Sequence, residues 1–147
     1  MLAASADPNV ILVVEDNPDD VALIQTSVNR AGHLLSPRFV TDGEQALAYL
    51  EGRDPFENRR QYPFPGLVVL DLQIPGKDGI QVLRWIRSNP RFEALQVVVW
   101  TGREDPKAAD RARSAGANLF LRKPMEAGGW INFLGIIALA LQRLPAG

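Results

Sequence analysis

Five short apolar runs constrain the fold of this chain more than any other feature of its sequence. Each is rich in Val, Leu, Ile or Phe, and none shows the alternation of apolar and polar residues that a half-exposed strand would need. Uninterrupted runs of this kind indicate strands buried on both faces, as in a parallel sheet covered by helices. The runs are residues 10–16, 37–42, 67–71, 95–101 and 119–124.

Segments with helical spacing and helix-end signals follow the runs. After the third run, Ile80 and Leu83, with Ile86 or Trp85, have the spacing of one face of a helix. After the second run, Asp42 is predicted to cap a helix that ends at Gly52. Strands and helices therefore alternate five times. This alternation predicts an α/β fold with a doubly wound, five-stranded parallel sheet and helices on both faces.

The length of 147 residues suits one domain, which we expect to span residues 1–147. Residues 1–8 are expected to form a disordered tail. Residues 52–66, which are rich in Pro and lack periodicity, are expected to form an extended loop. The N-terminus lacks the features of a secretory signal, and no apolar run is long enough to cross a bilayer. We therefore expect a cytoplasmic protein without a membrane partner.

Composition excludes several kinds of chemistry. The chain has no Cys and one His, His33, so disulfides, thiolate catalysis and metal sites built from Cys or several His are excluded. The formal net charge of −1 gives no basic excess, and we expect no nucleic-acid partner. Any metal site must use oxygen ligands, which favour a hard cation such as Mg²⁺.

Polar residues collect where the predicted strands end. Glu15 and Asp16 end the first run, Asp71 ends the third, Thr101 the fourth, and Lys123 lies near the end of the fifth. Since the carboxyl ends of parallel strands meet at one edge of a sheet, these side chains should lie close together. Three neighbouring carboxylates repel one another unless a cation neutralises them. With Mg²⁺, Lys123 and Thr101, the site suits a phosphoryl group, which Asp71 would receive as the attacking carboxylate.

The stretch after Asp71, QIPGKDG, bends the chain over this edge. Pro75 and Gly76 are expected to shape the turn, and a backbone carbonyl near Gln73 is expected to reach the metal. Gly79 lets the next helix begin close to the strand.

Each of these residues also has a simpler interpretation when it is taken alone. Asp71 could be a turn carboxylate, Thr101 a satisfied strand residue, and Lys123 a surface residue. Asp19 and Asp20 are well placed to begin the first helix. The common position of the polar residues at strand ends favours the functional interpretation.

Two other classes of function fit the pattern less well. A small-molecule phosphatase with an Asp nucleophile needs a second Asp two residues later, where this chain has Gln73. A nucleotide-binding module would have a loop rich in Gly, Ser or Thr after its first strand. Here that loop is EDNPDD, which would repel phosphate.

The motifs VVEDNPDD, VVLDLQIPGKDG, VVVWTG and LFLRKP resemble those of the receiver domain of bacterial two-component response regulators, in the same order and spacing. The resemblance covers nearly the whole chain. It implies a flavodoxin-like topology with strand order 2-1-3-4-5. A pseudo-receiver that acts as a scaffold without metal is disfavoured, because every key residue is present.

The resemblance also implies roles for the site residues. Asp71 would accept a phosphoryl group from a phosphohistidine on a sensor histidine kinase. Asp16, Asp71 and the backbone carbonyl of Gln73 would bind Mg²⁺ or Mn²⁺, and Glu15 would help through a water molecule. Lys123 would contact the phosphoryl oxygens. The chain would be a switch that phosphorylates itself and slowly loses the phosphate, and it would not be a turnover enzyme.

Thr101 would be the switch hydroxyl, and Phe120 the aromatic switch residue that turns inward as Thr101 moves.

Three residues depart from the common pattern: Glu15 stands where many receivers have Asp, Trp100 is bulky, and Gly102 replaces a small residue such as Ala or Ser. Arg103 lies at a position that tunes hydrolysis in the family, and we expect it to shield the acyl phosphate.

A narrower resemblance links the chain to stand-alone regulators paired with phytochrome kinases. It rests on VEDNPDDVALIQ, FVTDGEQALAYL, the Pro-rich loop and SNPRFEALQVVV. It implies a bacteriophytochrome as phosphodonor and a homodimer formed through the last helix. One helix follows Lys123, so we expect the output to be protein binding. A phosphorelay intermediate that passes phosphate to a histidine phosphotransfer protein is the alternative.

Two predicted helices bear on the output. The helix expected over residues 126–144 has apolar residues around more than one face, which indicates a second buried face and supports the dimer. The helix over residues 105–116 has only Ala on its inner face. It should bury little area and shift easily.

Overall fold

The computed structural model of the chain describes residues 6–31, 35–74, 78–102, 105–124 and 129–142. Five strands form one parallel sheet in the order β2-β1-β3-β4-β5, which confirms the predicted flavodoxin-like fold. The strands are β1 (Ala6–Val14), β2 (Ser36–Val40), β3 (Phe64–Asp71), β4 (Gln96–Thr101) and β5 (Leu119–Arg122).

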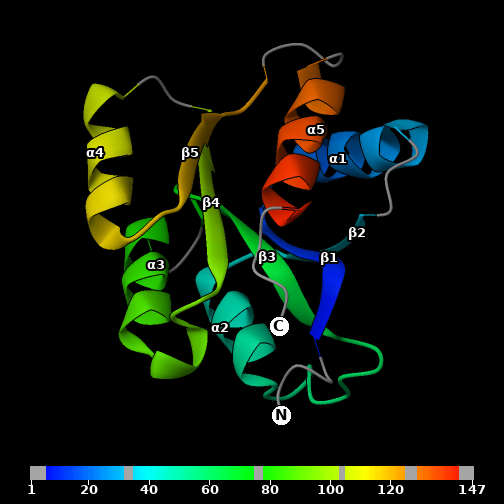
Figure 1. Cartoon of the computed structure of the whole chain (residues 1–147), viewed down its shortest axis with the longest axis vertical. Helices are drawn as coiled ribbons and strands as arrows, with labels where there is room; N and C mark the ends of the chain where they lie inside the picture. Colours follow the sequence, from blue (N-terminus) through cyan, green and yellow to red (C-terminus); the bar gives the residue numbers. More distant parts are fainter. Residues whose placement is uncertain (1–5, 32–34, 75–77, 103–104, 125–128, 143–147) are drawn as a thin grey trace.

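The described residues also form five α-helices and one 3₁₀ helix, which lie between the strands or, for α5, after the last strand (Figure 1). They are α1 (Pro18–Ala31), α2 (Gly43–Glu51), α3 (Gly79–Ser88), η2 (Pro90–Phe92), α4 (Pro106–Ala115) and α5 (Gly129–Gln142). Asp42 caps α2 by accepting a hydrogen bond from the backbone of Gln45, and Gly52 ends the helix with a φ of 68°. Both residues act as the sequence predicts.

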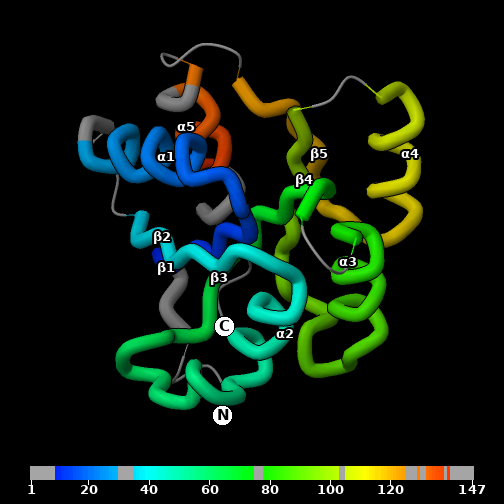
Figure 2. The backbone as a smooth tube through the Cα atoms, turned by 180° about the vertical axis from the view of Figure 1, so that it is seen from behind, coloured from blue at the N-terminus to red at the C-terminus, as the bar shows by residue number. Residues whose placement is uncertain are grey.

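Two apolar layers lie on opposite faces of the sheet because side chains alternate along each strand. On β1, Leu12 and Val14 belong to a cluster with residues of α2, α3 and α4, whereas Ile11 and Val13 belong to a cluster with residues of α1 and α5. Figures 1 and 2 show α1 and α5 side by side, apart from α2, α3 and α4. Helices therefore cover both faces, and the carboxyl ends of the strands remain at one edge.

Two boundaries and one short helix differ from the sequence prediction. Residues 6–8 belong to β1 instead of a disordered tail, because Ala6 and Asp7 pair with Phe64 and Pro65. An irregularity in the ladder separates these pairs from those that begin at Ile11. The expected loop over residues 52–66 ends earlier, since β3 begins at Phe64. The short helix η2 was not predicted. His33 lies outside the described residues.

Within the described part of the chain, no helix combines the length and the apolar character needed to cross a membrane.

Candidate functional site

Four strands bring the predicted polar residues to one edge of the sheet. Asp71 is the last residue of β3, Glu15 and Asp16 follow β1 directly, and Thr101 ends β4. Lys123 follows β5, and its backbone N–H donates to the carbonyl of Thr101 at 2.9 Å. This convergence is the one expected for the carboxyl ends of parallel strands.

Three carboxylates form a compact cluster at this edge. One oxygen each of Glu15, Asp16 and Asp71 lies within 4.8 Å of the others. Glu15 and Asp71 are buried, whereas Asp16 is exposed. The cluster therefore opens to solvent on the side of Asp16. Its all-oxygen donor set fits a hard divalent cation that keeps some of its water.

The ammonium of Lys123 neutralises part of this charge. Its Nζ lies 2.6 Å from Oε2 of Glu15 and 2.8 Å from Oδ2 of Asp71. A third carboxylate, that of Asp20 in the first turn of α1, lies 2.9 Å from the same nitrogen. Three carboxylates thus surround one ammonium, which donates hydrogen bonds to Asp20 and Asp71 and forms a close ion pair with Glu15.

Burial and ion pairing act against each other on these groups. Burial raises the pKa of Glu15 to about 7, although hydrogen bonds from Lys123 and from the backbone of Asn17 lower it. Burial lowers the pKa of Lys123, but hydrogen bonds to Asp71, Glu15 and Asp20 outweigh burial and hold the pKa above its ordinary value. The site therefore keeps a charged ammonium beside Asp71 at neutral pH.

The backbone after β3 holds Asp71 in place. The N–H of Gln73 donates to Oδ1 of Asp71 at 2.8 Å, so the two carboxylate oxygens have different partners. The N–H of Gly79 donates to the carbonyl of Leu72 at 3.3 Å. A Cβ atom at Gly79 would lie 2.6 Å from the backbone oxygen of Asp71, so α3 begins close to β3 because this residue is Gly. Pro75 and Gly76 lie outside the described residues.

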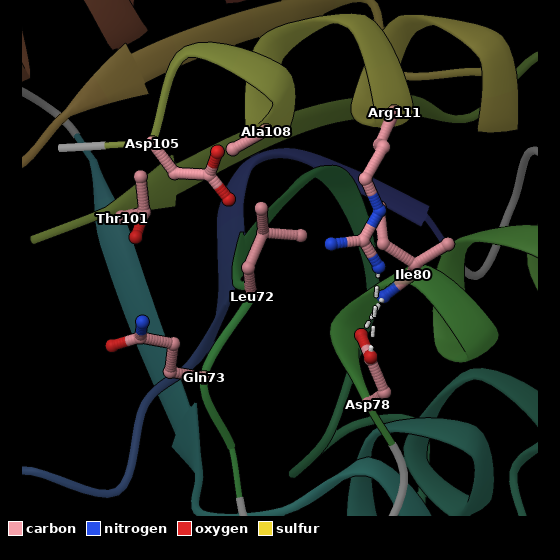
Figure 3. Close-up of a pocket in the computed structure, with 8 residues that line it drawn as sticks. All are labelled: Leu72, Gln73, Asp78, Ile80, Thr101, Asp105, Ala108 and Arg111. Atoms are coloured by element: carbon pink, nitrogen blue, oxygen red, sulfur yellow. Dashed lines mark hydrogen bonds and ion pairs between the residues drawn. The ribbon is translucent and has the colours of Figure 1, made fainter. Parts of the chain in front are cut away.

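A cavity of about 240 Å³ lies beside Thr101, between the ends of β3 and β4 and the helix α4. Figure 3 shows Thr101 and Gln73 at one end of it, and Asp78 and Arg111, which form an ion pair at 3.9 Å, at the other. Thr101 itself is 2% exposed. The buried side chain of Thr101 therefore borders this cavity on the side of α4.

The buried residues of α4 are Ala108, Ala112 and Ala115, as the sequence predicts. Alanine buries little apolar area, so the contact of α4 with the sheet is weak. Phe120 on β5 is half-buried and packs against the apolar cluster that contains Ala112 and Ala115. It pairs with Val99 of β4 in the sheet. Arg103, which was predicted to shield the acyl phosphate, lies outside the described residues.

Asp20 is the site residue that the sequence interpretation missed. It was taken as one of the acids that begin the first helix, and it does lie in the first turn of α1. In the sequence, Asp20 lies four residues after Asp16 and looks like any other acid in the first turn of a helix. Its contact with Lys123 joins residues 103 positions apart.

Comparison with known proteins agrees with this geometry. Residues 11–132 match the model of the response regulator receiver domain. The response regulator Rcp1 of Synechocystis sp. is 34% identical over 119 residues, which is 81% of this chain and 79% of that protein.

Two solved structures are similar over nearly their whole length. The Mn²⁺-bound form of Rcp1 has a TM-score of 0.82 at 32% identity and covers 95% of this chain and 100% of that one. The phosphorylated cyanobacterial phytochrome response regulator RcpA has a TM-score of 0.82 at 27% identity and covers 94% and 96%. The chain therefore belongs to the response regulator receiver domain family.

Proposed function

We propose that this protein is a phosphorylation switch in which Asp71 accepts a phosphoryl group from a sensor histidine kinase. One observation carries the proposal: the Asp71 carboxylate ends a central strand in contact with the Lys123 ammonium and within 4.8 Å of oxygens of Glu15 and Asp16. Phosphoryl transfer requires mainly positioning and the neutralisation of negative charge, and this arrangement supplies both.

In the proposed reaction, a carboxylate oxygen of Asp71 forms a bond to the phosphorus of the donor. The P–N bond of the phosphohistidine breaks, and its electron pair stays on the imidazole nitrogen, which then takes a proton from solvent. Lys123 lies 2.8 Å from Oδ2 of Asp71 and would neutralise charge on the phosphoryl oxygens. The N–H of Gln73 holds Oδ1 and orients the carboxylate.

Glu15, Asp16 and Asp71 would hold Mg²⁺ or Mn²⁺, with the backbone carbonyl of Gln73 as a further ligand. The oxygen donors and their separation support this assignment, and the solvent-exposed Asp16 leaves room for the water that Mg²⁺ retains. A cation bound there would offset the charge of the carboxylates and of the incoming phosphoryl oxygens.

We further propose that Thr101 and Phe120 transmit the signal. Thr101 borders the cavity next to α4, and its hydroxyl would move toward a phosphoryl group on Asp71. The half-buried ring of Phe120 would then turn inward. Since α4 rests on the sheet through Ala side chains, the change would move α4 at low cost.

The partners are proposed from the relatives and from α5. The phytochrome-linked relatives support a bacteriophytochrome as the donor. The transfer is proposed to take place in the cytoplasm. Ile136 and Leu139 on α5 are 43% and 54% exposed, which supports a homodimer through this helix. A phosphorelay intermediate that returns the phosphate to a histidine phosphotransfer protein is the alternative. Loss of the phosphoryl group to such a protein, instead of slow hydrolysis, would favour the alternative.

The test uses acetyl phosphate as donor, with and without Mg²⁺, and follows labelling by intact-protein mass spectrometry. We expect Mg²⁺-dependent addition of one phosphoryl group, which Asp71→Asn abolishes and Asp16→Asn strongly reduces. Asp42→Asn changes the cap of α2 outside the carboxylate cluster and should be labelled like the wild type. Labelling of Asp71→Asn at the wild-type rate would refute the proposal.

A further inference from the structure

We propose that Asp20 is a positioning residue for phosphoryl transfer, whose carboxylate holds the ammonium of Lys123 in place beside Asp71. This inference rests on the proposed function, since it concerns the same reaction. Asp20 does not contact Asp71 in any interaction that the described residues show. It acts through Lys123, whose Nζ it approaches to 2.9 Å.

The three carboxylates that contact the ammonium differ in what surrounds them. Glu15 and Asp71 are buried, with side-chain exposures of 0% and 4%, and both belong to the carboxylate cluster. Asp20 has a side-chain exposure of 19% and stands outside that cluster. It therefore forms the outer wall of the ammonium site, on the side of α1.

This difference matters as soon as the charge of the cluster changes. A cation held by Glu15 and Asp71, or a phosphoryl group on Asp71, removes part of the negative charge that attracts Lys123. Among the carboxylates that contact Lys123 in the described residues, Asp20 is the one that neither event engages. The carboxylate of Asp20 would thus keep the ammonium at the site when its other two partners are engaged.

Lys123 needs such an anchor because its side chain is long and flexible. Its backbone N–H is fixed to Thr101, and its Nζ lies 5.0 Å from the centre of the Trp100 ring. These contacts define the floor of the site and leave the outer side to Asp20. Without Asp20, the ammonium would gain access to solvent and would spend less time beside Asp71.

The first experiment measures phosphorylation by acetyl phosphate at saturating Mg²⁺ over a range of donor concentrations. Asp20→Asn keeps the shape of the side chain and removes its charge. We expect the maximal rate to fall on the order of tenfold, with little change in the donor concentration at half-maximal rate. The Mg²⁺ concentration at half-maximal rate should stay within about twofold, because Asp20 lies outside the carboxylate cluster.

Asp19→Asn is the matched control. Asp19 is the neighbouring acid in the same first turn of α1, and its side chain is exposed. The substitution removes the same charge from the same helix terminus, so it reports any general effect on the anionic donor or on α1. We expect the control to phosphorylate at the wild-type rate within about twofold.

The second experiment observes Lys123 directly and needs neither donor nor metal. The chain has three lysines, Lys77, Lys107 and Lys123, so ¹⁵N-labelled lysine gives a simple NMR spectrum of ammonium groups. Lys77→Arg and Lys107→Arg assign the signals. We expect Asp20→Asn to shift the Lys123 signal and speed its proton exchange, whereas Asp19→Asn should leave it unchanged.

The outcomes separate the two proposals. A wild-type maximal rate in Asp20→Asn, or a rate above it, would overturn the role of Asp20 while leaving Asp71 as acceptor. An unchanged Lys123 signal in that variant would overturn it as well. If the wild type itself is not labelled on Asp71, the proposed function fails and the inference fails with it, even where the Lys123 signal responds to Asp20.

Discussion

The ammonium nitrogen of Lys123 lies 5.0 Å from the centre of the Trp100 ring. On β4, Trp100 is fully buried directly before Thr101, and its ring also packs at 5.1 Å against that of Phe133 on α5. The indole therefore separates the charged site from the apolar layer beneath α5. A cation next to an aromatic face is a favourable contact, so the ring also supports the position of Lys123.

We expect replacement of Trp100 to depend on whether an aromatic ring remains. Trp100→Ala should lower the free energy of unfolding by about 3–5 kcal/mol, because it opens a cavity between the sheet and Phe133. Trp100→Phe keeps a ring against both neighbours and should cost less than about 2 kcal/mol. Urea unfolding followed by circular dichroism measures both. Equal losses in the two variants would show that the ring contacts are unimportant.

Gly79→Ala should disturb the site through the backbone. The new methyl group would lie 2.6 Å from the backbone oxygen of Asp71, so α3 must move away from β3. We expect a loss of about 1–3 kcal/mol in the free energy of unfolding and slower phosphorylation by acetyl phosphate.

Gly135→Ala in α5 provides the matched control for this substitution. A Cβ there would meet nothing within 4 Å, and the residue lies within a helix. We expect it to stabilise the protein by about 0.5–1 kcal/mol without any effect on phosphorylation. If both Gly→Ala variants behave alike, the close approach at Gly79 has no role.

Arg59 should matter for stability and not for phosphorylation. Its guanidinium donates to the backbone oxygens of Tyr49 and Leu50 at 2.8 Å and 2.9 Å, and so satisfies carbonyls at the end of α2. Arg59→Ala should cost about 1–3 kcal/mol in denaturant unfolding. The exposed neighbour Arg60 is the control, and Arg60→Ala should change stability by less than about 0.5 kcal/mol. A site defect in Arg59→Ala would contradict this separation of roles.

The hydroxyl of Tyr49 predicts a dependence of stability on alkaline pH. It donates to the carbonyl of Pro63 at 2.9 Å, and burial raises the pKa of Tyr49 above its ordinary value of 10.0. Above pH 10 the unfolded chain therefore loses the Tyr49 proton before the folded protein does, and the contribution of this residue to stability falls as pH rises.

Tyr49→Phe lacks both the hydrogen bond and the titration. The wild type should be more stable by about 1 kcal/mol at pH 8, and this difference should shrink above pH 10. Urea unfolding of both proteins at several pH values measures it. A difference that stays constant from pH 8 to pH 11 would mean that Tyr49 ionises alike in both states.

Much of the fold could be predicted because apolar runs and helix-end residues act locally. Asp42 and Gly52 bound α2 as expected, and the five runs became five neighbouring strands. The edge where Glu15, Asp16 and Asp71 meet followed from one rule, that parallel strands place their carboxyl ends together. Contacts between distant residues did not follow from any local signal.

Two features show where local patterns fail. The strand pairing of Ala6 with Phe64 depends on the path of the loop before β3, which the Pro-rich sequence does not specify. Asp20 looks like an ordinary first-turn acid, and its contact with Lys123 arises when β5 is placed beside β4 and α1 lies over the end of β1. Such residues are identified from the three-dimensional positions of the side chains, because no sequence motif marks them.

Lys123→Met should make the stability of the protein depend on a bound cation, because the ammonium that neutralises the buried carboxylates is then missing. The substitution keeps much of the side-chain volume and leaves the Glu15 and Asp71 carboxylates buried without the ammonium that lies 2.6 Å and 2.8 Å from them. Breaking a buried ion pair in this way costs about 3–5 kcal/mol, and we expect a loss of this order in metal-free urea unfolding. Mg²⁺ should restore part of the loss, since a bound cation stabilises the folded state and removes the same repulsion.

Lys107→Met, at an exposed position in α4, is the control and should respond to Mg²⁺ like the wild type. If Mg²⁺ stabilises Lys123→Met no more than the wild type, the ammonium and the cation do not share the carboxylates, and the proposed site is wrong.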